Sequence, residues 1–228
     1  MESTSATRIA IEDVSGRPDH PERLARLGAL AISGQAVLLA SAWFLPLASE
    51  YELVGDHISE LVLGRFGVVQ TIAFLVAGAG TIALAVAIRS LTAGARGSLF
   101  GSLLIAIYGT GAILIAFFPT DRIDSQADVA ALSTTGTIHV LVSLVSFVAV
   151  VIGMFVLTWT FARTARWRTS VRWSSLLAGA ALALFFVQNQ GPWVGLMQRL
   201  MVTAIACWLI LAAFRVRSIA AAGVGEVG

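Results

Sequence analysis

The hydrophobic positions of this chain form long uninterrupted blocks, unlike the short stripes of a soluble core. Six runs contain no Asp, Glu, Lys or Arg, and they cover residues 27–49, 66–88, 97–120, 129–162, 173–198 and 200–214. Each of the first five exceeds the roughly 20 residues that a helix needs to cross a hydrocarbon core about 30 Å thick. The sixth run is shorter, so the sixth span must include Arg199 near one end.

These blocks predict an all-α polytopic membrane protein, a bundle of six transmembrane helices. A membrane barrel strand would alternate polar and apolar residues, and these stretches are apolar on every face. The predicted spans are about 27–47, 68–89, 98–118, 137–162, 173–189 and 196–214, within a membrane domain at 25–217. Residues 1–24 are expected to form a cytoplasmic tail, and 218–228 a flexible C-terminal tail. With 57% hydrophobic and 12% charged residues among 228, the composition excludes a water-soluble domain.

The basic residues indicate an orientation. All fifteen are Arg, and twelve of them precede the first span, lie in the second and fourth loops, or follow the last span. Because cytoplasmic loops carry the excess of Lys and Arg, we expect both termini in the cytoplasm of a bacterial plasma membrane. The opposite side is acidic and carries Glu50, Glu52, Asp56, Glu60, Asp121, Asp124 and Asp128.

Uncommon polar residues gather at the outer level of five of the six predicted helices. They occur in the stretches 56–61 (DHISEL), 117–121 (FFPTD), 137–139 (TIH), 188–190 (QNQ) and 198–199 (QR). Polar groups in or near hydrocarbon are costly unless they find partners. We therefore expect these side chains to turn inward and meet in one chamber beneath the outer surface. Cys207 is the single cysteine, so an intrachain disulfide is excluded.

The same stretches carry a family resemblance. The ISEL stretch after His57, the FPTD exit at 118–121, the lone His139 opening a helix and the late QR at 198–199 resemble a family of bacterial and archaeal membrane proteins. That family is catalogued as domain of unknown function 998, and the resemblance covers about residues 28–216. It implies six helices but no established reaction. A fainter likeness is to the Frag1 and DRAM-like six-helix proteins of eukaryotes.

The leading hypothesis is a membrane-embedded acid/base enzyme that acts on an isoprenoid or other lipid-like substrate dissolved in the bilayer. Its most concrete form is protonation-initiated cyclisation without a diphosphate. Asp121 would donate the proton and His139 would orient it, while Glu60 and His57 would form the deprotonating side. Arg199 would keep one carboxylate ionised. The residues expected to bind the substrate are Trp43, Phe117, Phe118, Phe185, Trp193, Gln188, Asn189 and Arg199.

Structural interpretations compete with these roles. Asp121 is equally consistent with a helix cap, and the 56–60 stretch is consistent with a capping arrangement. The side chain of Arg199 is equally consistent with an extension to the lipid headgroups. Among functions, a lipid-remodelling hydrolase or transferase could use Ser59 or a metal-bound water, and a scaffold protein would use the polar layer only to join helices. A proton-coupled carrier is a less favoured alternative.

The expected partners are the bilayer and an apolar small molecule. Only His57 and His139 lie outside the N-terminal tail, so a three-histidine zinc site is disfavoured. We predict no metal and no other cofactor. Phosphate-bearing substrates are disfavoured because the outer side is acidic and no glycine-rich phosphate loop is present. Nucleic acid is not expected as a partner, and the oligomeric state is left open.

Overall fold

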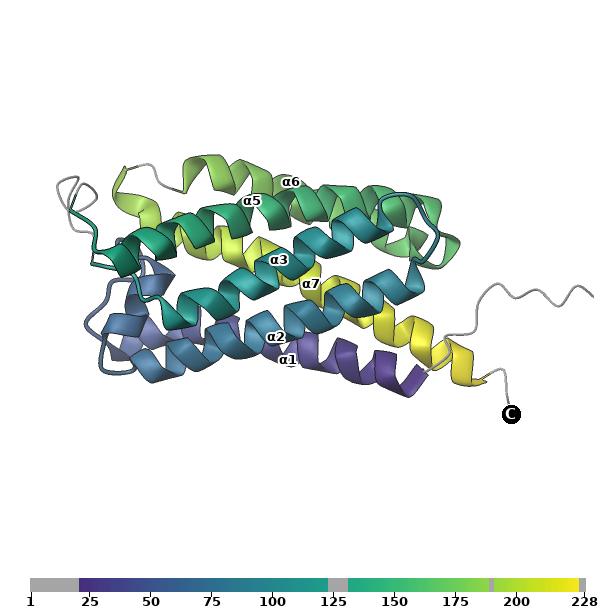
Figure 1. Cartoon of the computed structure of the whole chain (residues 1–228), viewed down its shortest axis with the longest axis horizontal. Coiled ribbons are helices and arrows are strands. Elements are labelled where there is room, and N and C mark those ends of the chain that lie inside the picture. Colours follow the sequence, from purple (N-terminus) through teal and green to yellow (C-terminus); the bar gives the residue numbers. More distant parts are fainter. Residues whose placement is uncertain (1–20, 123–130, 189–190, 226–228) are drawn as a thin grey trace, which may run out of the picture.

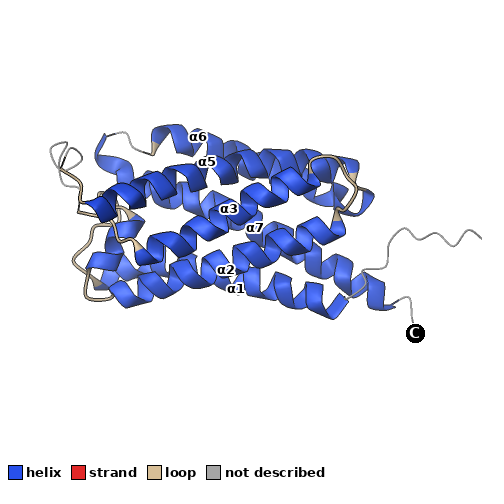
Figure 2. Cartoon of the chain, in the orientation of Figure 1, coloured by secondary structure: helices blue, strands red, loops and turns tan. Residues whose placement is uncertain are grey.

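The structure, a computed structural model, describes residues 21–122, 131–188 and 191–225, with side chains described up to residue 222. Within these ranges every regular element is a helix and there is no strand (Figure 2). Six helices are long and apolar enough to cross a membrane. The predicted all-helical architecture with six spans is therefore confirmed. The N-terminal tail up to residue 20, together with Asp124, Asp128 and Asn189, lies outside the described residues.

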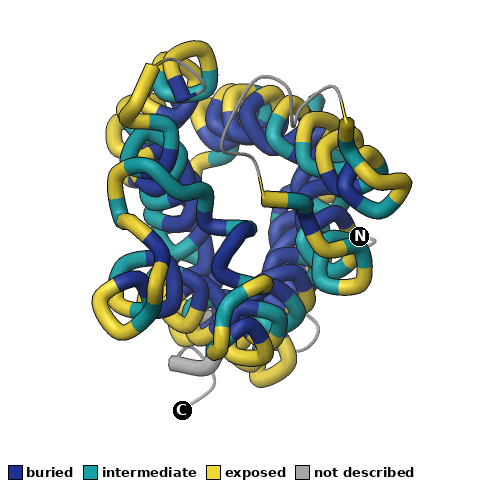
Figure 3. Tube along the Cα trace, turned by 90° about the vertical axis from the view of Figure 1, so that its left-hand side faces the viewer, coloured by how far each residue is buried: buried dark blue, intermediate teal, exposed yellow. Residues whose placement is uncertain are grey.

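The helices run up and down in sequence order. Their bounds are α1 Pro21–Phe44, η1 Leu45–Ala48, η2 Ile58–Leu63, α2 Gly67–Leu91, α3 Ser98–Phe117, α5 Thr134–Arg163, η3 Ala165–Ser170, α6 Val171–Val187, η4 Gly191–Trp193 and α7 Val194–Gly225. The 3-10 segments occur in the connections after α1, α5 and α6. Figure 1 shows α7 crossing the bundle behind α3, and it contacts α1, α2, α5 and α6. Seen end-on, buried residues face inward and exposed ones face outward (Figure 3).

The two ends of the bundle differ. We call the end covered by residues 45–66 the capped end; it lies at the left of Figure 1. The opposite end, where α1 begins and α7 finishes, is the arginine-rich end. Its described arginines are Arg23, Arg26, Arg89, Arg96, Arg163, Arg166, Arg168, Arg172, Arg215 and Arg217. The unequal charge that the sequence indicates is therefore a property of the folded bundle.

Helix α7 is longer than the predicted sixth span. It continues to Gly225, whereas the sequence interpretation ended the span at 214 and expected a flexible tail from 218. The reason is packing: Val216 is fully buried, Ile219 is 5% exposed and Ala220 is 1% exposed. The alanine-rich segment also has high helix propensity. In the structure, residues 218–225 belong to α7, whereas the sequence interpretation assigned them to a tail.

The arginine-rich half of the bundle is filled by aromatic rings. Trp167 of η3 is fully buried, and its ring stacks on Phe161 with the centroids 4.1 Å apart. Phe161 in turn stacks on Trp208 of α7 at 5.9 Å. Such rings each bury a large apolar area. The interior space described below lies nearer the capped end.

Small residues bring the helix backbones close together. A Cβ atom added at Gly78 of α2 would lie 2.5 Å from the carbonyl oxygen of Gly109 of α3, and one at Gly34 of α1 would lie 2.5 Å from that of Val76. Glycine is needed at such contacts because the neighbouring atoms belong to the backbone and cannot rotate away.

Gly78→Ala should lower the free energy of unfolding of the detergent-solubilised chain by about 1–3 kcal/mol, because the added methyl group forces α2 and α3 apart. Gly179→Ala is the matched control, since nothing lies within 4 Å of a Cβ there. Alanine should stabilise α6 at that position by up to about 1 kcal/mol. Denaturant titration followed by circular dichroism measures both. Equal effects of the two substitutions would contradict the α2–α3 contact.

Candidate functional site

The first turns of α7 hold the 54–58 segment against the bundle. The side-chain oxygen Oε1 of Gln198 accepts the Ile58 backbone N–H at 2.8 Å, and the Leu196 backbone N–H donates to the Val54 carbonyl at 3.1 Å. These contacts join residues about 140 positions apart in the chain. They fix η2, and therefore His57 and Ser59, relative to α7.

The buried side chain of Arg199 joins α7 to two other segments at the capped end. Its side chain is 0% exposed; Nε donates to the Ala42 carbonyl at 2.9 Å and Nη1 donates to the Asp56 carbonyl at 2.6 Å. Ala42 lies in the last turn of α1, where carbonyls lack intrahelical partners and a cation is favourable. Nη2 has no partner within the described part of the chain. Arg199 therefore does not extend to the headgroups.

His57 and Glu60 form a coupled pair. The imidazole Nδ1 of His57 lies 2.9 Å from Oε1 of Glu60, and the two residues make the capping box of η2. The capping interpretation of the 56–60 stretch is thus correct, with His57 as the N-cap residue. Glu60 is only 2% exposed. Its Oε2 has no partner among the described residues.

His139 is held in one orientation at the start of α5. It is 4% exposed, and its Nδ1 lies 2.7 Å from the backbone carbonyl of Phe118. A carbonyl can only accept, so Nδ1 carries the hydrogen and the neutral ring presents Nε2 as an acceptor. Phe118 thus contributes its backbone to the site. No described residue makes a hydrogen bond to Nε2.

Asp121 caps the beginning of α5. Its two carboxylate oxygens accept from Ser133, one from the backbone N–H at 2.7 Å and one from the hydroxyl at 2.9 Å. Ser133 is itself the N-cap residue and accepts from the backbone of Gly136. A Cβ atom added at Gly136, one turn before His139, would overlap the carboxylate of Asp121. These contacts agree with the interpretation of Asp121 as a helix cap. The role of Asp121 as a proton donor stays a prediction.

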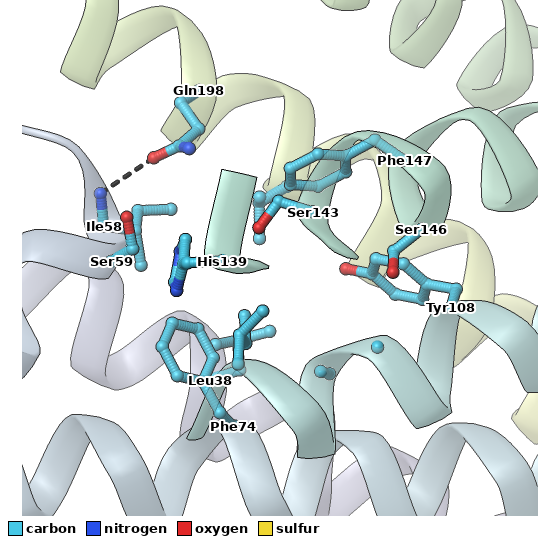
Figure 4. Close-up of a pocket in the computed structure, with 14 residues that line it drawn as sticks. Leu38, Ile58, Ser59, Phe74, Tyr108, His139, Ser143, Ser146, Phe147 and Gln198 are labelled. Atoms are coloured by element: carbon cyan, nitrogen blue, oxygen red, sulfur yellow. Dashed lines mark hydrogen bonds between the residues drawn. The ribbon is translucent and has the colours of Figure 1, made fainter. Parts of the chain in front are cut away.

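A cavity lies between these groups and the interior of the bundle (Figure 4). The empty space among its lining atoms is about 560 Å³, a figure that includes the open part at its mouth. Six elements contribute to its wall. The lining residues are Leu38, Ile58, Ser59, Phe74, Tyr108, Gly111, Ala112, Ile115, His139, Ser143, Ser146, Phe147, Gln198 and Val202.

A cleft between α5 and α6 continues this cavity to the side of the bundle. It shares Ser59, His139, Ser143, Phe147 and Gln198 with the cavity, and its empty volume is about 1040 Å³ including the open part. The remaining lining residues are His57, Thr120, Val140, Leu144, Phe185, Phe186 and Gln188. Val140, Leu144 and Phe186 are exposed on the lipid-facing side. The space thus opens sideways instead of being enclosed.

The predicted site residues divide into two groups. His57, His139, Phe185 and Gln188 line the cleft, with Glu60 held by His57 behind it. The others lie elsewhere: Phe117 and Trp193 are exposed by 67% and 54%, and Trp43 donates its indole N–H to Thr203. Their roles in substrate binding stay predictions, as does that of Asn189.

Other lining residues were missed, chiefly Phe74, Tyr108, Ser143 and Phe147. One signal for them is present in the sequence. Positions 139, 143 and 146 follow the i, i+4, i+7 spacing that places side chains on one helix face. His139 with two serines at this spacing marks a polar stripe on an otherwise apolar helix.

No group of three or more His, Cys, Asp or Glu side chains that could hold a metal ion occurs among the described residues. Two imidazoles line the cleft, but the nearest carboxylates are engaged by His57 and Ser133. The side chains of the cleft can themselves transfer protons and form hydrogen bonds.

Fold and cavity together define a polytopic helical membrane protein with an interior site open toward the lipid. The chain belongs to the family described as protein of unknown function (DUF998), whose model matches residues 28–215. This confirms the resemblance carried by the ISEL, FPTD and QR stretches. No curated protein and no solved structure matches the chain.

Proposed function

We propose that this protein is a membrane-embedded acid/base enzyme whose lipid-like substrate enters sideways between α5 and α6. The observation that supports this best is His139: its Nδ1–H is engaged by the Phe118 carbonyl, so Nε2 is left as a proton acceptor on the wall of a cavity open to lipid. Burying a histidine in a membrane helix costs free energy, and ionisable residues at such positions are typically functional.

The proposed reaction is an isomerisation of an unsaturated chain, with cyclisation as its specific form. When His57 is protonated, Nδ1–H donates to Glu60 and Nε2–H is available to the cleft. That proton adds to a double bond of the substrate, and the resulting cation is captured by a second double bond or a hydroxyl oxygen of the same chain. Attack by a hydroxyl oxygen gives an oxonium, which loses its O–H proton to Nε2 of His139; attack by a double bond gives a second carbocation, which loses a proton from the neighbouring carbon to the same nitrogen. One proton enters the substrate and one leaves it, so the product is an isomer, and return of the proton from His139 to His57 restores the enzyme.

The aromatic wall is consistent with a cationic intermediate. Phe74, Tyr108 and Phe147 line the inner cavity, and aromatic faces attract positive charge. In this proposal Asp121 positions the first turn of α5, and with it His139, instead of donating the proton as the sequence interpretation had it.

Isotope incorporation tests the reaction class. The purified chain in lipid nanodiscs should convert a component of the neutral-lipid fraction of bacterial membranes into an isomer, and in D₂O that isomer should carry one deuterium on carbon, seen by mass spectrometry. Incorporation of ¹⁸O from labelled water without deuterium would instead favour the hydrolase that uses Ser59. If neither isotope enters any lipid, the enzymatic proposal is wrong.

We also propose that the arginine-rich end faces the cytoplasm. The support is the charge difference between the two ends, because positive residues are retained on the cytoplasmic side during insertion. The site would then lie in the outer half of the plasma membrane.

Thiol labelling tests this orientation. In a Cys207→Ser background, a membrane-impermeant maleimide applied to intact cells should label Ala48→Cys, which is exposed at the capped end. It should label Ala93→Cys, exposed between α2 and α3, only after the cells are permeabilised. The reverse pattern would place both termini outside.

A further inference from the structure

The wall of the cavity restricts the head group of any lipid that enters. The polar side chains that line the cavity and the cleft carry hydroxyls, amides and imidazoles. The lining includes no Arg, Asp or Glu. Arg199 follows Gln198 in sequence, yet its guanidinium is directed to the carbonyls of Ala42 and Asp56. A phosphate or carboxylate head would therefore find no Arg on the lining, and the His57 imidazole is already paired with Glu60.

The hydrogen bonds already made on the wall decide which atoms remain for a ligand. Gln198 uses its Oε1 to accept from Ile58, so its amide Nε2–H groups remain as donors. His139 uses its Nδ1–H on Phe118, so its Nε2 remains as an acceptor. Both residues line the inner cavity and the cleft (Figure 4).

A hydroxyl group complements this pair. Its O–H can donate to Nε2 of His139 while its oxygen accepts from Nε2–H of Gln198. An ionised carboxylate or diphosphate has only acceptors and cannot satisfy the imidazole nitrogen.

The cavity also offers apolar side chains that can contact the hydrocarbon chain of the ligand. Leu38, Phe74, Ile115, Phe147 and Val202 form the deeper wall of the cavity. A chain that reaches it from the bilayer passes the exposed Leu144 and Phe186 at the cleft. Burial of such a chain supplies much less binding energy when the chain leaves lipid than when it leaves water. Hydrogen bonds to the head group must therefore provide the selectivity.

We propose that the cavity binds an uncharged lipid alcohol, with its hydroxyl between Gln198 and His139 and its hydrocarbon chain among the apolar residues of the inner cavity. This assignment rests on the proposed function for the location of the site, and it names the substrate class. Binding is measured without turnover, so it is tested separately from the reaction.

The test is equilibrium binding of tritiated geranylgeraniol to the full chain in nanodiscs, with three competitors that share its chain. Unlabelled geranylgeraniol should compete best. Its methyl ether, which accepts but cannot donate, should compete about tenfold less well, since one hydrogen bond is lost. Geranylgeranyl diphosphate should compete more weakly still. Competition by the diphosphate equal to or better than that of the alcohol would overturn the proposal.

Two variants locate the binding site. Ala112→Phe places a ring in the inner cavity and should weaken binding of the alcohol at least about tenfold by steric exclusion. Ala180→Phe, at an exposed position of α6 outside the lining, should leave it unchanged. Equal affinity in both variants would overturn the assignment of the site.

If Ala112→Phe does not elute as a folded monodisperse protein, His139→Asn replaces it. This variant should bind the alcohol and its methyl ether equally; a retained preference would overturn the assignment. The two proposals fail differently. Selective binding of the alcohol with no deuterium incorporation would remove the proposed reaction only, whereas deuterium incorporation without saturable alcohol binding would remove the head-group assignment only.

Discussion

Arg199→Ala should lower the free energy of unfolding by about 3–6 kcal/mol, because each of two hydrogen bonds from a charged group contributes about 1.5–3 kcal/mol. The substitution leaves the buried carbonyl of Ala42 and the partly buried carbonyl of Asp56 without their donor. It also creates a cavity where a fully buried side chain stood. Because Arg199 joins α7 to α1 and to the 51–57 segment, the loss should be seen as a lower denaturation midpoint in detergent.

The matched control for this experiment is Arg65→Ala. Arg65 is at the same end but exposed, and its guanidinium lies 4.4 Å from the Phe66 ring centroid. An exposed cation–π contact contributes only about 0.5–1 kcal/mol, so this variant should be close to wild type. Similar decreases in the free energy of unfolding of the two variants would show that the hydrogen bonds of Arg199 contribute no more than an exposed contact.

His139→Asn should reduce the rate of product formation by roughly 10²–10⁴, the usual contribution of a positioned acid or base. The asparagine amide nitrogen occupies about the position of Nδ1 and can still donate to the Phe118 carbonyl. Only the Nε2 acceptor is removed. The denaturation midpoint should therefore change little, which separates a chemical role from a structural one.

The measurement is the initial rate of deuterium incorporation into the lipid isomer by wild type and variant in identical nanodiscs. His139→Ala provides the comparison, since it removes both ring nitrogens and should also lower stability. A His139→Asn rate within about tenfold of wild type would exclude Nε2 as the proton acceptor.

The candidate site was predictable only in part. The concentration of polar residues at one level is visible in the sequence, and His57, His139, Phe185 and Gln188 do line one space. The roles of neighbouring residues were not visible. Gln198 and Arg199 are adjacent in the chain, yet one lines the cavity and the other is directed at backbone carbonyls. Successive helix residues differ by about 100° in direction, and only the rotation of α7 in the bundle assigns each to its side.

Asp121 shows a second limit. A carboxylate after a proline at a helix exit suits a cap and an acid equally well. Its partner, Ser133, lies twelve residues later, and the choice depends on how the chain returns to begin α5.

The sequence by itself determined that this chain forms six membrane helices with unequal charge at the two ends. Both properties are local. About 20 apolar residues in hydrocarbon must satisfy their backbone hydrogen bonds within one helix, and the charges that flank each helix stay at its ends however the helices pack. The tertiary structure alone decided which nitrogen of His139 faces the cavity, which residues Arg199 joins, and where the bundle opens to lipid. These depend on the rotation and spacing of helices, set by close contacts such as Gly78 against Gly109.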